Sequence, residues 1–369
     1  MLQRLYVHNF KCLENFELAT KGIPSALLIG ENGTGKSTVA NALEVLQGIG
    51  RGMNRVGKMV RRQDFGFGRT DLPMRFEIEV LLGGRQCVYI IAFELTEEFK
   101  EPRVAEEKLI VDGAPIYTRK EAQVTLHATA DLIKAQFLVD RHLVALPIIQ
   151  DKSAKDPLHL FKTWLARTVI LAPIPALMTG DSDCESLEPK RDASNLGEWY
   201  SGLLNDSPAA YTQIEKYLQD VMPDIKDFVN PLFGNDFRRM IVRFEKNAAE
   251  LEVHFADLSD GEKCFFLCAV VLAANPFYGP LLCFWDEPDN YLSLSEVGHF
   301  VTALRRAFVN GGQLLATSHN PEAIREFSDD NTFVLDRKSH LEPTIIRRLS
   351  DIAVTGDLVD ALIRGDVRL

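Results

Sequence analysis

One stretch of the chain carries more structural information than any other: Gly30-Glu31-Asn32-Gly33-Thr34-Gly35-Lys36-Ser37. The apolar run 25–30 leads into it as a predicted buried strand, and residues 37–46 follow with the pattern of a helix. Glycines let such a loop turn its backbone N–H groups inward, and the helix N-terminus adds partial positive charge. The order strand, loop, helix predicts a phosphate-binding loop of the GxxxxGK[ST] type, a P-loop.

Two side chains of this loop are expected to act on ATP. Lys36 would neutralise oxygens of the β- and γ-phosphates, and Ser37 would ligate Mg²⁺. The further nucleotide-binding residues predicted here are Asn32, Gly33, Gly35 and Thr38. ATP and Mg²⁺ are therefore the predicted cofactors.

A second apolar run, 281–285, ends in two carboxylates, Asp286 and Glu287, which is the Walker B pattern. Asp286 would hold Mg²⁺ through its water shell, and Glu287 would polarise the attacking water as general base. An Asp-Glu pair after an apolar run is common and can simply be a strand end that faces solvent. The P-loop upstream favours the catalytic interpretation.

A third motif, Leu258-Ser259-Asp260-Gly261-Glu262-Lys263, lies shortly before these carboxylates and opens a predicted helix. Ser259 can be explained as a helix cap alone. The hexapeptide and its offset from Asp286 also resemble the ABC signature sequence. That resemblance implies that the Ser259 hydroxyl and the Gly261 N–H point at the γ-phosphate bound by a second protomer.

Two further segments fit the same pattern. Asp289, in the stretch 288–292 directly after the carboxylates, resembles a D-loop residue, which contacts nucleotide across a dimer interface. His319 follows a buried strand, 313–317, where a switch histidine contacts the γ-phosphate. A lone histidine at a strand end is usually structural, but this position relative to Glu287 favours the switch role.

With the opening stretch 5–16, these motifs identify a resemblance to ABC-type ATPases of the RecF/SMC branch, in particular short AAA members related to the ATPase half of OLD-family proteins. It implies an α/β P-loop NTPase fold: an ABC-type head with an antiparallel β insert, a helical lobe and no long coiled coil. The expected parts are 1–150, a nucleotide-binding lobe with the β insert; 151–275, a helical lobe ending in the signature helix; and 276–369, the Walker B, D-loop and switch-histidine part. The expected assembly is a head-to-tail homodimer or a higher oligomer.

The pattern between the motifs agrees with that layout. Residues 75–93 read as two strands joined at Gly83-Gly84, and 104–111 and 122–127 extend the antiparallel sheet. Residues 155–220 read as helical, interrupted by an exposed loop over 181–185, before strands at 240–244 and 251–255 and a helix over 261–274. The glutamine that senses Mg²⁺ in this family has two candidates, Gln63 and Gln150.

A basic stretch over 51–69 is predicted as a mobile loop, because glycines are interspersed among its cations: Arg51, Arg55, Lys58, Arg61, Arg62 and Arg69. Such a loop attracts phosphates, so double-stranded DNA is a candidate partner. Docking of an acidic protein explains it equally well. The net charge of −11 argues against a protein surrounded by nucleic acid.

The composition indicates a cellular location and the state of the cysteines. The 369 residues are 46% hydrophobic, with no apolar run of transmembrane length and no signal peptide, so a cytoplasmic protein without a membrane partner is expected. The six cysteines form no CxxC pair, which favours reduced thiols over a zinc site. Cys264 and Cys268 would share a helix face, but no second ligand pair accompanies them.

Three biological roles are compatible with an ATPase of this type. A transporter subunit is disfavoured, because the insert between Lys36 and Ser259 is too long. A RecF-like DNA-repair ATPase and the ATPase of an antiphage defence module both fit, and the family resemblance favours the second. The chain ends soon after His319 and shows no nuclease motif, so any effector, such as a nuclease or toxin, is expected to be a separately encoded partner.

Overall fold

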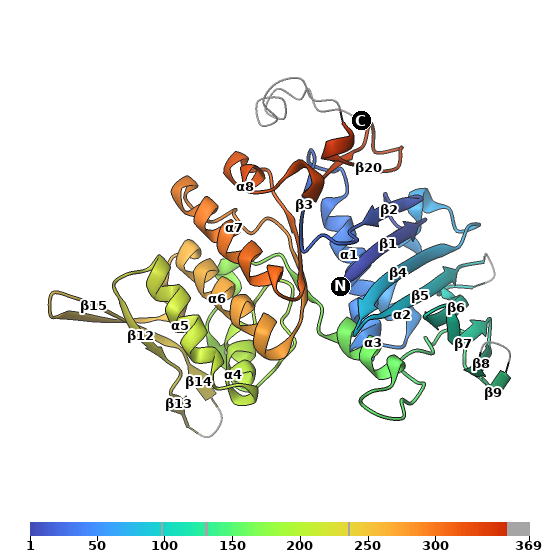
Figure 1. Ribbon diagram of the computed structural model, residues 1–369, viewed down its shortest axis with the longest axis horizontal. Coiled ribbons are helices and arrows are strands. Elements are labelled where there is room, and N and C mark those ends of the chain that lie inside the picture. The colour runs from blue at the N-terminus through green and yellow to red at the C-terminus, as the bar shows by residue number, and fades with distance from the viewer. Residues whose placement is uncertain (97–98, 130–131, 235–236, 353–369) are drawn as a thin grey trace. The chain divides into compact units, whose positions relative to one another are not determined.

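The computed structural model describes residues 1–96, 99–129, 132–234 and 237–352. The chain divides into two compact units (Figure 1). Unit 1 comprises Met1–Ile23, Leu28–Thr168 and Asp329–Leu369, and unit 2 comprises Pro24–Leu27 and Val169–Ser328. The P-loop therefore belongs to unit 1, whereas the predicted Walker B, D-loop and switch-histidine part belongs to unit 2 together with the signature helix. This grouping differs from the predicted parts 1–150, 151–275 and 276–369.

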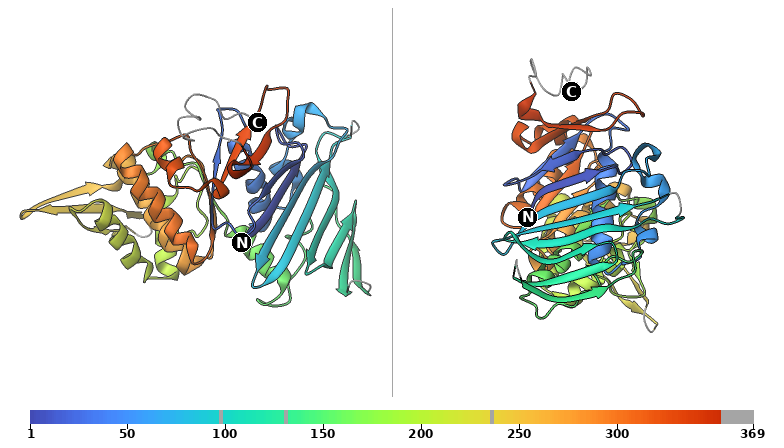
Figure 2. Two further views of the ribbon diagram at one scale, coloured as in Figure 1. Left: turned by 45° about the horizontal axis from the view of Figure 1, so that its top comes forward. Right: turned by 90° about the vertical axis from the view of Figure 1, so that its right-hand side faces the viewer.

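An eight-stranded antiparallel sheet dominates the described part of unit 1, in the order β2-β1-β4-β5-β6-β7-β8-β9 (Figure 2). Its strands are β1 (Leu2–His8), β2 (Phe16–Ala19), β4 (Met74–Leu82), β5 (Arg85–Glu94), β6 (Arg103–Val111), β7 (Ala114–Lys120), β8 (Gln123–Thr129) and β9 (Leu132–Leu138). The predicted hairpin over 75–93 is present, with its turn at Gly83-Gly84. Strands were predicted at 104–111 and 122–127, and the structure adds β7 and β9.

One face of this sheet is apolar and the other is polar, because the strands alternate. In β4, Phe76 and Ile78 are buried, whereas Arg75 and Glu77 are half-buried on the opposite face. The apolar face packs against helices: the rings of Tyr89 in β5 and Phe161 in α3 (Pro157–Ala166) lie 5.5 Å apart. α3 in turn contacts α1 (Lys36–Gly50), the helix that follows the P-loop. The sheet is therefore the platform on which the P-loop helix rests.

The remaining elements that the structure describes in unit 1 are further strands and several short helices. β3 (Ser25–Ile29) crosses the unit boundary, and its last residues, Leu28 and Ile29, lead directly into the loop. β19 (Thr332–Asp336) pairs antiparallel with β20 (Ile345–Arg348). The short elements of this unit are α2 (Val56–Met59), η1 (Arg62–Asp64), η2 (Gly66–Gly68), η5 (Asp329–Asn331) and η6 (Leu349–Asp351).

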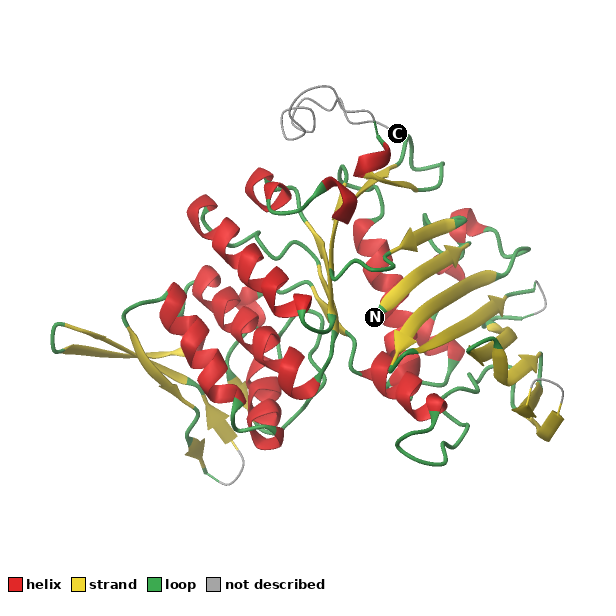
Figure 3. Cartoon of the chain, in the orientation of Figure 1, coloured by secondary structure: helices red, strands yellow, loops and turns green. Residues whose placement is uncertain are grey.

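Unit 2 is built on parallel strands with helices beside them (Figure 3). β10 (Val169–Leu171) pairs with β17 (Leu282–Trp285), β17 pairs with β18 (Gln313–Thr317), and the Leu314 N–H donates to the Pro24 carbonyl. The helices are α4 (Leu196–Asp206), α5 (Ala210–Val221), α6 (Asp260–Tyr278), α7 (Leu294–Val309) and α8 (Pro321–Arg325), with turns η3 (Pro175–Leu177) and η4 (Phe255–Asp257). Helix α6 is buried on nearly all sides from Lys263 to Asn275, because apolar residues surround its axis.

Two small antiparallel sheets complete unit 2. One has the order β11-β14-β13, from β11 (Asp181–Ser182), β14 (Phe237–Arg239) and β13 (Leu232–Phe233). The other has the order β12-β15-β16, from β12 (Ile225–Val229), β15 (Ile241–Lys246) and β16 (Ala249–His254). The prediction of an exposed loop over 181–185 is wrong at its start, because Asp181 and Ser182 pair with β14. The helical prediction for 155–220 also missed β10.

Two expectations from composition can be compared with the described residues. No helix among them is both long and apolar enough to cross a membrane. All six cysteines are free, and only Cys184 is exposed. Cys264 and Cys268 lie in α6, and neither belongs to a group of metal-ligating side chains within the described residues.

Candidate active site

The backbone of the P-loop requires glycine at the residue that precedes α1. Gly35, the residue before α1, has φ 102°. A Cβ atom there would lie 2.8 Å from Thr344 Oγ1 and 2.9 Å from Cys12 Sγ. The same Cys12 thiol is 3.5 Å from the hydroxyl of Thr38. A larger residue at Gly35 would therefore both strain the backbone and displace the loop's neighbours.

Lys36 lies across the loop that precedes it. Its ammonium donates to the carbonyls of Gly30, at 2.7 Å, and Glu31, at 3.0 Å. Ser37, in the first turn of α1, is exposed, as are Asn32 and Gly33. The structure thus brings together the P-loop residues predicted to bind phosphate, with the N-terminus of α1 at their centre.

Sequence reasoning missed a second contact surface of the P-loop, the β19–β20 connection. The Thr344 hydroxyl donates to the Thr34 carbonyl at 2.8 Å, and His340 Nε2 lies 3.9 Å from the position of a Cβ on Gly33. The Arg337 guanidinium donates to the His340 carbonyl and stands 6.0 Å from the ring of Phe67. No sequence motif includes these residues, because their contacts with the P-loop join parts of the chain that are distant in sequence.

Phe67 itself has unusual geometry for a bulky residue. Its φ is 54°, in the left-handed region, and the side chain is 38% exposed. The guanidinium of Arg69 is 5.5 Å from the ring centre, in addition to Arg337 at 6.0 Å. An exposed ring between two guanidinium groups is a surface on which a nucleobase can stack.

The prediction of a mobile loop over 51–69 is wrong for the described structure. The segment contains α2, η1 and η2, and its Phe65 is buried in a bridge to Phe10. Apolar residues inside the segment hold it in place, whereas the prediction considered only its glycines and cations. The Lys11 N–H also donates to the Asp64 carbonyl, so this segment docks on the turn after β1.

The six predicted basic residues now separate into two groups. Arg55 pairs with Glu101 at 3.0 Å, Arg69 pairs with Glu14 at 2.7 Å, and Arg51 Nε donates to the Ala166 carbonyl. Lys58, Arg61 and Arg62 are exposed, and Arg55 is exposed as well despite its ion pair with Glu101. Gln63 is also exposed, in η1, and Gln150 is exposed elsewhere in unit 1.

In unit 2, the end of β17 presents Asp286 and Glu287 together. The buried hydroxyl of Thr317 donates to Asp286 Oδ1 at 2.6 Å and accepts from the Glu287 N–H at 2.9 Å. Glu287 has φ 51°, a left-handed conformation that a residue of this type adopts only under constraint. Thr317 therefore holds the Asp286 carboxylate and the Glu287 backbone, a role that no motif assigned to it.

His319 lies beside Glu287. Its Nε2 is 3.3 Å from Glu287 Oε1, and the Asn290 amide donates to Glu287 Oε2. The guanidinium of Arg191, a residue outside every predicted motif, stands 3.8 Å from Asp286 Oδ2. The structure brings Asp286, Glu287 and His319 into one cluster.

Asp289, the predicted D-loop residue, lies two positions after Glu287. Its side chain is turned inward and 5% exposed, and its Oδ2 accepts from the Ser318 hydroxyl at 2.9 Å. Burial raises the pKa of this carboxyl above its ordinary value, and the hydrogen bond from Ser318 only partly offsets that effect. In this arrangement Asp289 ties the segment after Glu287 to the residue next to His319.

The signature segment forms the N-terminus of α6. Ser259 caps the helix: its hydroxyl accepts from the Glu262 N–H at 3.3 Å, and Glu262 accepts from the Ser259 N–H at 2.7 Å. A Cβ on Gly261 would lie 3.1 Å from the Tyr291 carbonyl, so the signature touches the segment after Asp289. The capping role of Ser259 is confirmed, and its exposed position is compatible with the predicted phosphate contact.

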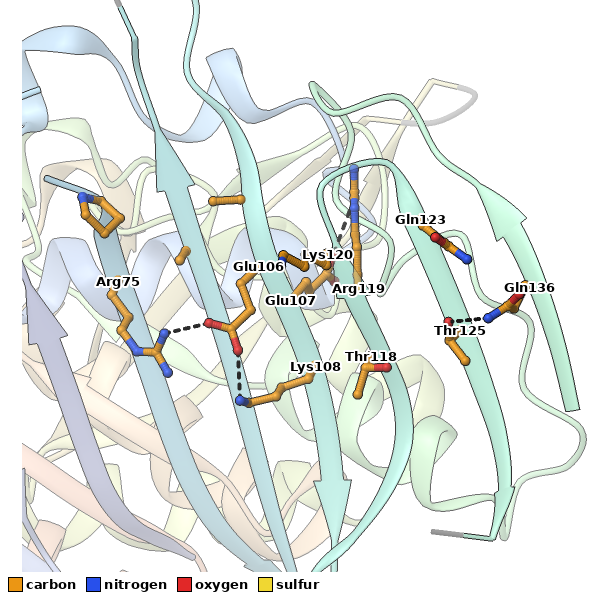
Figure 4. A pocket seen from close by; sticks show the side chains of 13 residues that line it. Arg75, Glu106, Glu107, Lys108, Thr118, Arg119, Lys120, Gln123, Thr125 and Gln136 are labelled. Carbon is orange, nitrogen blue, oxygen red and sulfur yellow. Dashed lines mark hydrogen bonds and ion pairs between the residues drawn. The ribbon is translucent and has the colours of Figure 1, made fainter. Parts of the chain in front are cut away.

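A groove of about 720 Å³ lies on the polar face of the unit 1 sheet (Figure 4). Its cations are largely neutralised, because Glu106 accepts from both Arg75 and Lys108 at 2.8 Å. None of the predicted nucleotide-binding residues lines it. The groove is therefore separate from the P-loop.

Comparisons with known proteins agree with this architecture. A protein family described as "AAA domain, putative AbiEii toxin, Type IV TA system" matches residues 182–325, less than half of the chain. The matched part contains Ser259, Asp286, Glu287 and His319 but not the P-loop. None of the curated proteins compared with the chain matches it.

Solved structures of SMC heads have a similar fold. The head bound to the C-winged helix domain of ScpA has a TM-score of 0.59 at 12% identity, covering 95% of this chain and 99% of that one. The SMC head domain from Thermotoga maritima has a TM-score of 0.51 at 14% identity, covering 96% and 99%. A head with an extended coiled coil, bound to a ScpA domain derived from Pyrococcus furiosus, has a TM-score of 0.51 at 12% identity, covering 99% of each chain.

The predicted fold class is confirmed: the chain has the fold of an ABC-type P-loop ATPase head, with an antiparallel sheet and helices. No long coiled coil is present among the described elements. With a complete P-loop and the Walker B carboxylates, the comparisons indicate that the protein is an ATPase.

Proposed function

We propose that this ATPase hydrolyses MgATP as a head-to-tail homodimer with composite sites. The observation that carries the proposal is the cluster at the end of β17, where Thr317 and His319 order the carboxylates of Asp286 and Glu287. Buried hydroxyl groups and a strained backbone at a strand end are arrangements that serve chemistry rather than stability. The chain also holds every phosphate-binding group of a P-loop.

Each residue has a role that its surroundings support. Lys36 and the N–H groups at the start of α1 bind phosphate oxygens, and Glu287 accepts a proton from the attacking water while His319 orients it. Mg²⁺, when bound, would neutralise phosphate charge. Asp286 and Ser37 would hold it, because carboxylate and hydroxyl oxygens are donors that Mg²⁺ prefers. Ser259 and Gly261 complete the site of the second protomer.

For the biological role, we propose the ATPase component of a defence module that works with a separately encoded effector. The matched family description, which names a toxin of a toxin–antitoxin system, supports a two-component arrangement. The relation to the ATPase half of OLD-family proteins remains part of this proposal.

A RecF-like role on double-stranded DNA is the second candidate, and it rests on Lys58, Arg61 and Arg62. Three phosphate contacts would give a salt dependence of about −3 in log K against log salt, much weaker than that of proteins with six or more contacts. The structure thus reduces the electrostatic support for this candidate relative to the six cations of the sequence.

The experiment that tests the proposal is ATP turnover by the purified chain, measured against protein concentration with and without double-stranded DNA. We expect specific turnover to rise with concentration, because each site needs two protomers. Stimulation by DNA would favour the RecF-like role, and indifference to DNA would favour a protein effector. Lys36→Ala is the control and should lose nucleotide binding. Normal nucleotide affinity in Lys36→Ala would contradict the P-loop assignment.

A further inference from the structure

Every carboxylate oxygen at the end of β17 faces a partner from unit 2. Three of these oxygens meet residues of the predicted motifs or their immediate neighbours: Thr317, His319 and Asn290. The fourth, Asp286 Oδ2, faces the Arg191 guanidinium at 3.8 Å. Arg191 thus forms an ion pair with Asp286. The carboxylate predicted to hold Mg²⁺ therefore already has a counter-charge of the protein's own.

Backbone hydrogen bonds determine where Arg191 lies. The Ala172 N–H donates to the Arg191 carbonyl at 2.7 Å, and the Ile174 N–H donates to the Asp192 carbonyl at 3.0 Å. Residues 191–192 thus pair with the chain that continues from β10. Because the Asp286 N–H donates to the Leu171 carbonyl at 2.7 Å, the same chain also positions Asp286. The side-chain contact is consequently built into the fold of unit 2.

The contact is long for an ion pair. In the same unit, Arg243 donates to both oxygens of Asp227 at 2.6 and 3.0 Å, the geometry of a strong bidentate pair. At 3.8 Å, Arg191 and Asp286 attract through charge without a hydrogen bond. Only 27% of the Arg191 side chain and 12% of the Asp286 side chain are exposed, so water screens this attraction only in part. A pair of this kind neutralises a carboxylate yet can be displaced.

We propose that Arg191 is a positioning residue that competes with Mg²⁺ for the carboxylate of Asp286 and so sets the metal concentration at which the ATPase becomes active. The inference rests on the proposed function. A divalent cation held through Asp286 is repelled by the guanidinium, or must push it aside. Either way, the charge of Arg191 lowers metal affinity.

The test measures how tightly the full chain, saturated with ADP, binds Mn²⁺ as a probe for Mg²⁺. The electron paramagnetic resonance signal of free Mn²⁺ reports how much of the ion remains unbound. Arg191→Gln should bind Mn²⁺ roughly three- to tenfold more tightly than wild type, the size of effect expected for a partly exposed charge pair. Arg191→Lys keeps the charge and should stay within about twofold of wild type. Arg306→Gln, at an exposed position in α7, makes the same change in net charge and should leave Mn²⁺ affinity unchanged.

A second readout separates this role from a purely structural one. In Arg191→Gln the Mg²⁺ concentration for half-maximal turnover should fall by the same factor as the Mn²⁺ dissociation constant, with kcat unchanged. Arg191→Met, which retains the aliphatic stem, gives the same comparison if the glutamine variant does not fold. If the wild type binds Mn²⁺ and ADP but the neutral variants bind Mn²⁺ no more tightly than the wild type, the proposed role of Arg191 is wrong and the ATPase site is unaffected. A wild type that fails to bind Mn²⁺ with ADP would overturn the proposed ATPase site as well.

Discussion

Glu287 shows how a single residue can combine a backbone constraint with chemistry. Its left-handed backbone, at φ 51°, costs on the order of 1 kcal/mol for a residue that is not glycine. The hydrogen bond from its N–H to Thr317 maintains that conformation, and the side chain then points to His319. A residue held in a costly conformation next to a histidine is better explained by catalysis than by folding.

We therefore expect Glu287→Gln to bind ATP normally and to turn it over roughly 10²- to 10⁴-fold more slowly, the usual contribution of a general base. Binding is measured with a fluorescent ATP analogue and turnover by phosphate release. Glu322→Gln, at a half-buried position in α8 where the side chain pairs with Arg325, serves as the control. Near-normal turnover in Glu287→Gln would show that another group activates the water.

Phe67 leads to a second prediction for a single side chain. If its exposed ring stacks on the base of ATP, Phe67→Ala should weaken ATP binding about fivefold or more, as removal of a stacking aromatic usually does. Binding of inorganic tripolyphosphate, which has no base, should not change. Phe99→Ala removes another ring that lies under a guanidinium and should affect neither ligand. Equal weakening of both ligands in Phe67→Ala would instead mean that the P-loop itself had shifted.

At the scale of elements, a buried polar network ties the large sheet of unit 1 to the segment after β9. Glu107 in β6 is fully buried and accepts from the hydroxyl groups of Tyr89 and Tyr117. It also accepts from the backbone N–H groups of Ala145 and Leu146 at 2.7 and 2.8 Å. Burial raises the pKa of both tyrosines well above the ordinary value, so they remain neutral donors. Every contact of this carboxylate is therefore with a donor.

Glu107→Gln places an amide NH₂ group among those donors and removes the charge that faces Arg119. We expect a loss of about 3–5 kcal/mol in the free energy of unfolding, the usual effect of breaking a buried ionic network. Urea unfolding followed by circular dichroism measures it. Glu79→Gln, on the polar face of the same sheet beside Arg4, should cost less than about 1 kcal/mol. Similar losses in the two variants would mean that the buried network adds little stability.

The segment that joins β17 to α7 contains the buried carboxyl of Asp289. Because its pKa is raised in the folded protein, the folded state binds more protons than the unfolded state once the pH exceeds the ordinary value of this group. The contribution of Asp289 to stability therefore falls as the pH rises through the raised pKa. Asp289→Asn lacks this dependence and keeps an oxygen that accepts from Ser318.

We expect Asp289→Asn to gain melting temperature relative to wild type as the pH increases from about 4, the ordinary pKa of an aspartate. Differential scanning calorimetry measures the melting temperature of both proteins at each pH. The difference between the two proteins removes the effect of the other carboxyl groups, which titrate in both. A relative melting temperature that decreases with pH would mean that the charged form of Asp289 is the favoured one, and that its inward contact with Ser318 matters more than burial.

At the scale of the whole molecule, the composite-site proposal predicts complementation between two inactive variants. Ser259→Arg should bind ATP without hydrolysing it, and Lys36→Ala should not bind ATP. Mixed together, half of the dimers combine the two chains, and each such dimer has one intact site. Turnover should therefore recover to about a quarter of the wild-type value if protomers exchange freely.

Lys36→Ala mixed with Glu287→Gln is the matched control, because both defects act on the nucleotide of the P-loop side. That mixture should show no recovery beyond the sum of its parts. Absence of recovery in the first mixture, with dimers demonstrated by sedimentation, would contradict sites shared between protomers.

Much of the architecture followed from local patterns in the chain. Alternating strands predicted the β4–β5 hairpin with its turn at Gly83-Gly84, and an apolar run before Asp286 predicted β17. Such features depend on residues near one another in sequence, where side-chain periodicity and turn chemistry act directly. The same kind of pattern gave a wrong prediction for the segment 51–69. Its glycines predicted a mobile loop, but the contact of the buried Phe65 with Phe10 holds the segment in place.

By itself, the sequence predicted the reacting groups that we propose for this ATPase: Lys36 and Ser37 in the P-loop, and Asp286 and Glu287 after a buried strand. Each motif is local, because a phosphate-binding loop or a strand end is built from consecutive residues. Only the tertiary structure decided which distant side chains hold those groups. Thr317 bonds the Asp286 carboxylate and the Glu287 backbone, Arg191 supplies a counter-charge to Asp286, and Thr344 donates to the Thr34 carbonyl of the P-loop. Hydroxyl and guanidinium groups are common throughout the chain, and packing alone selects which of them come within reach of the site.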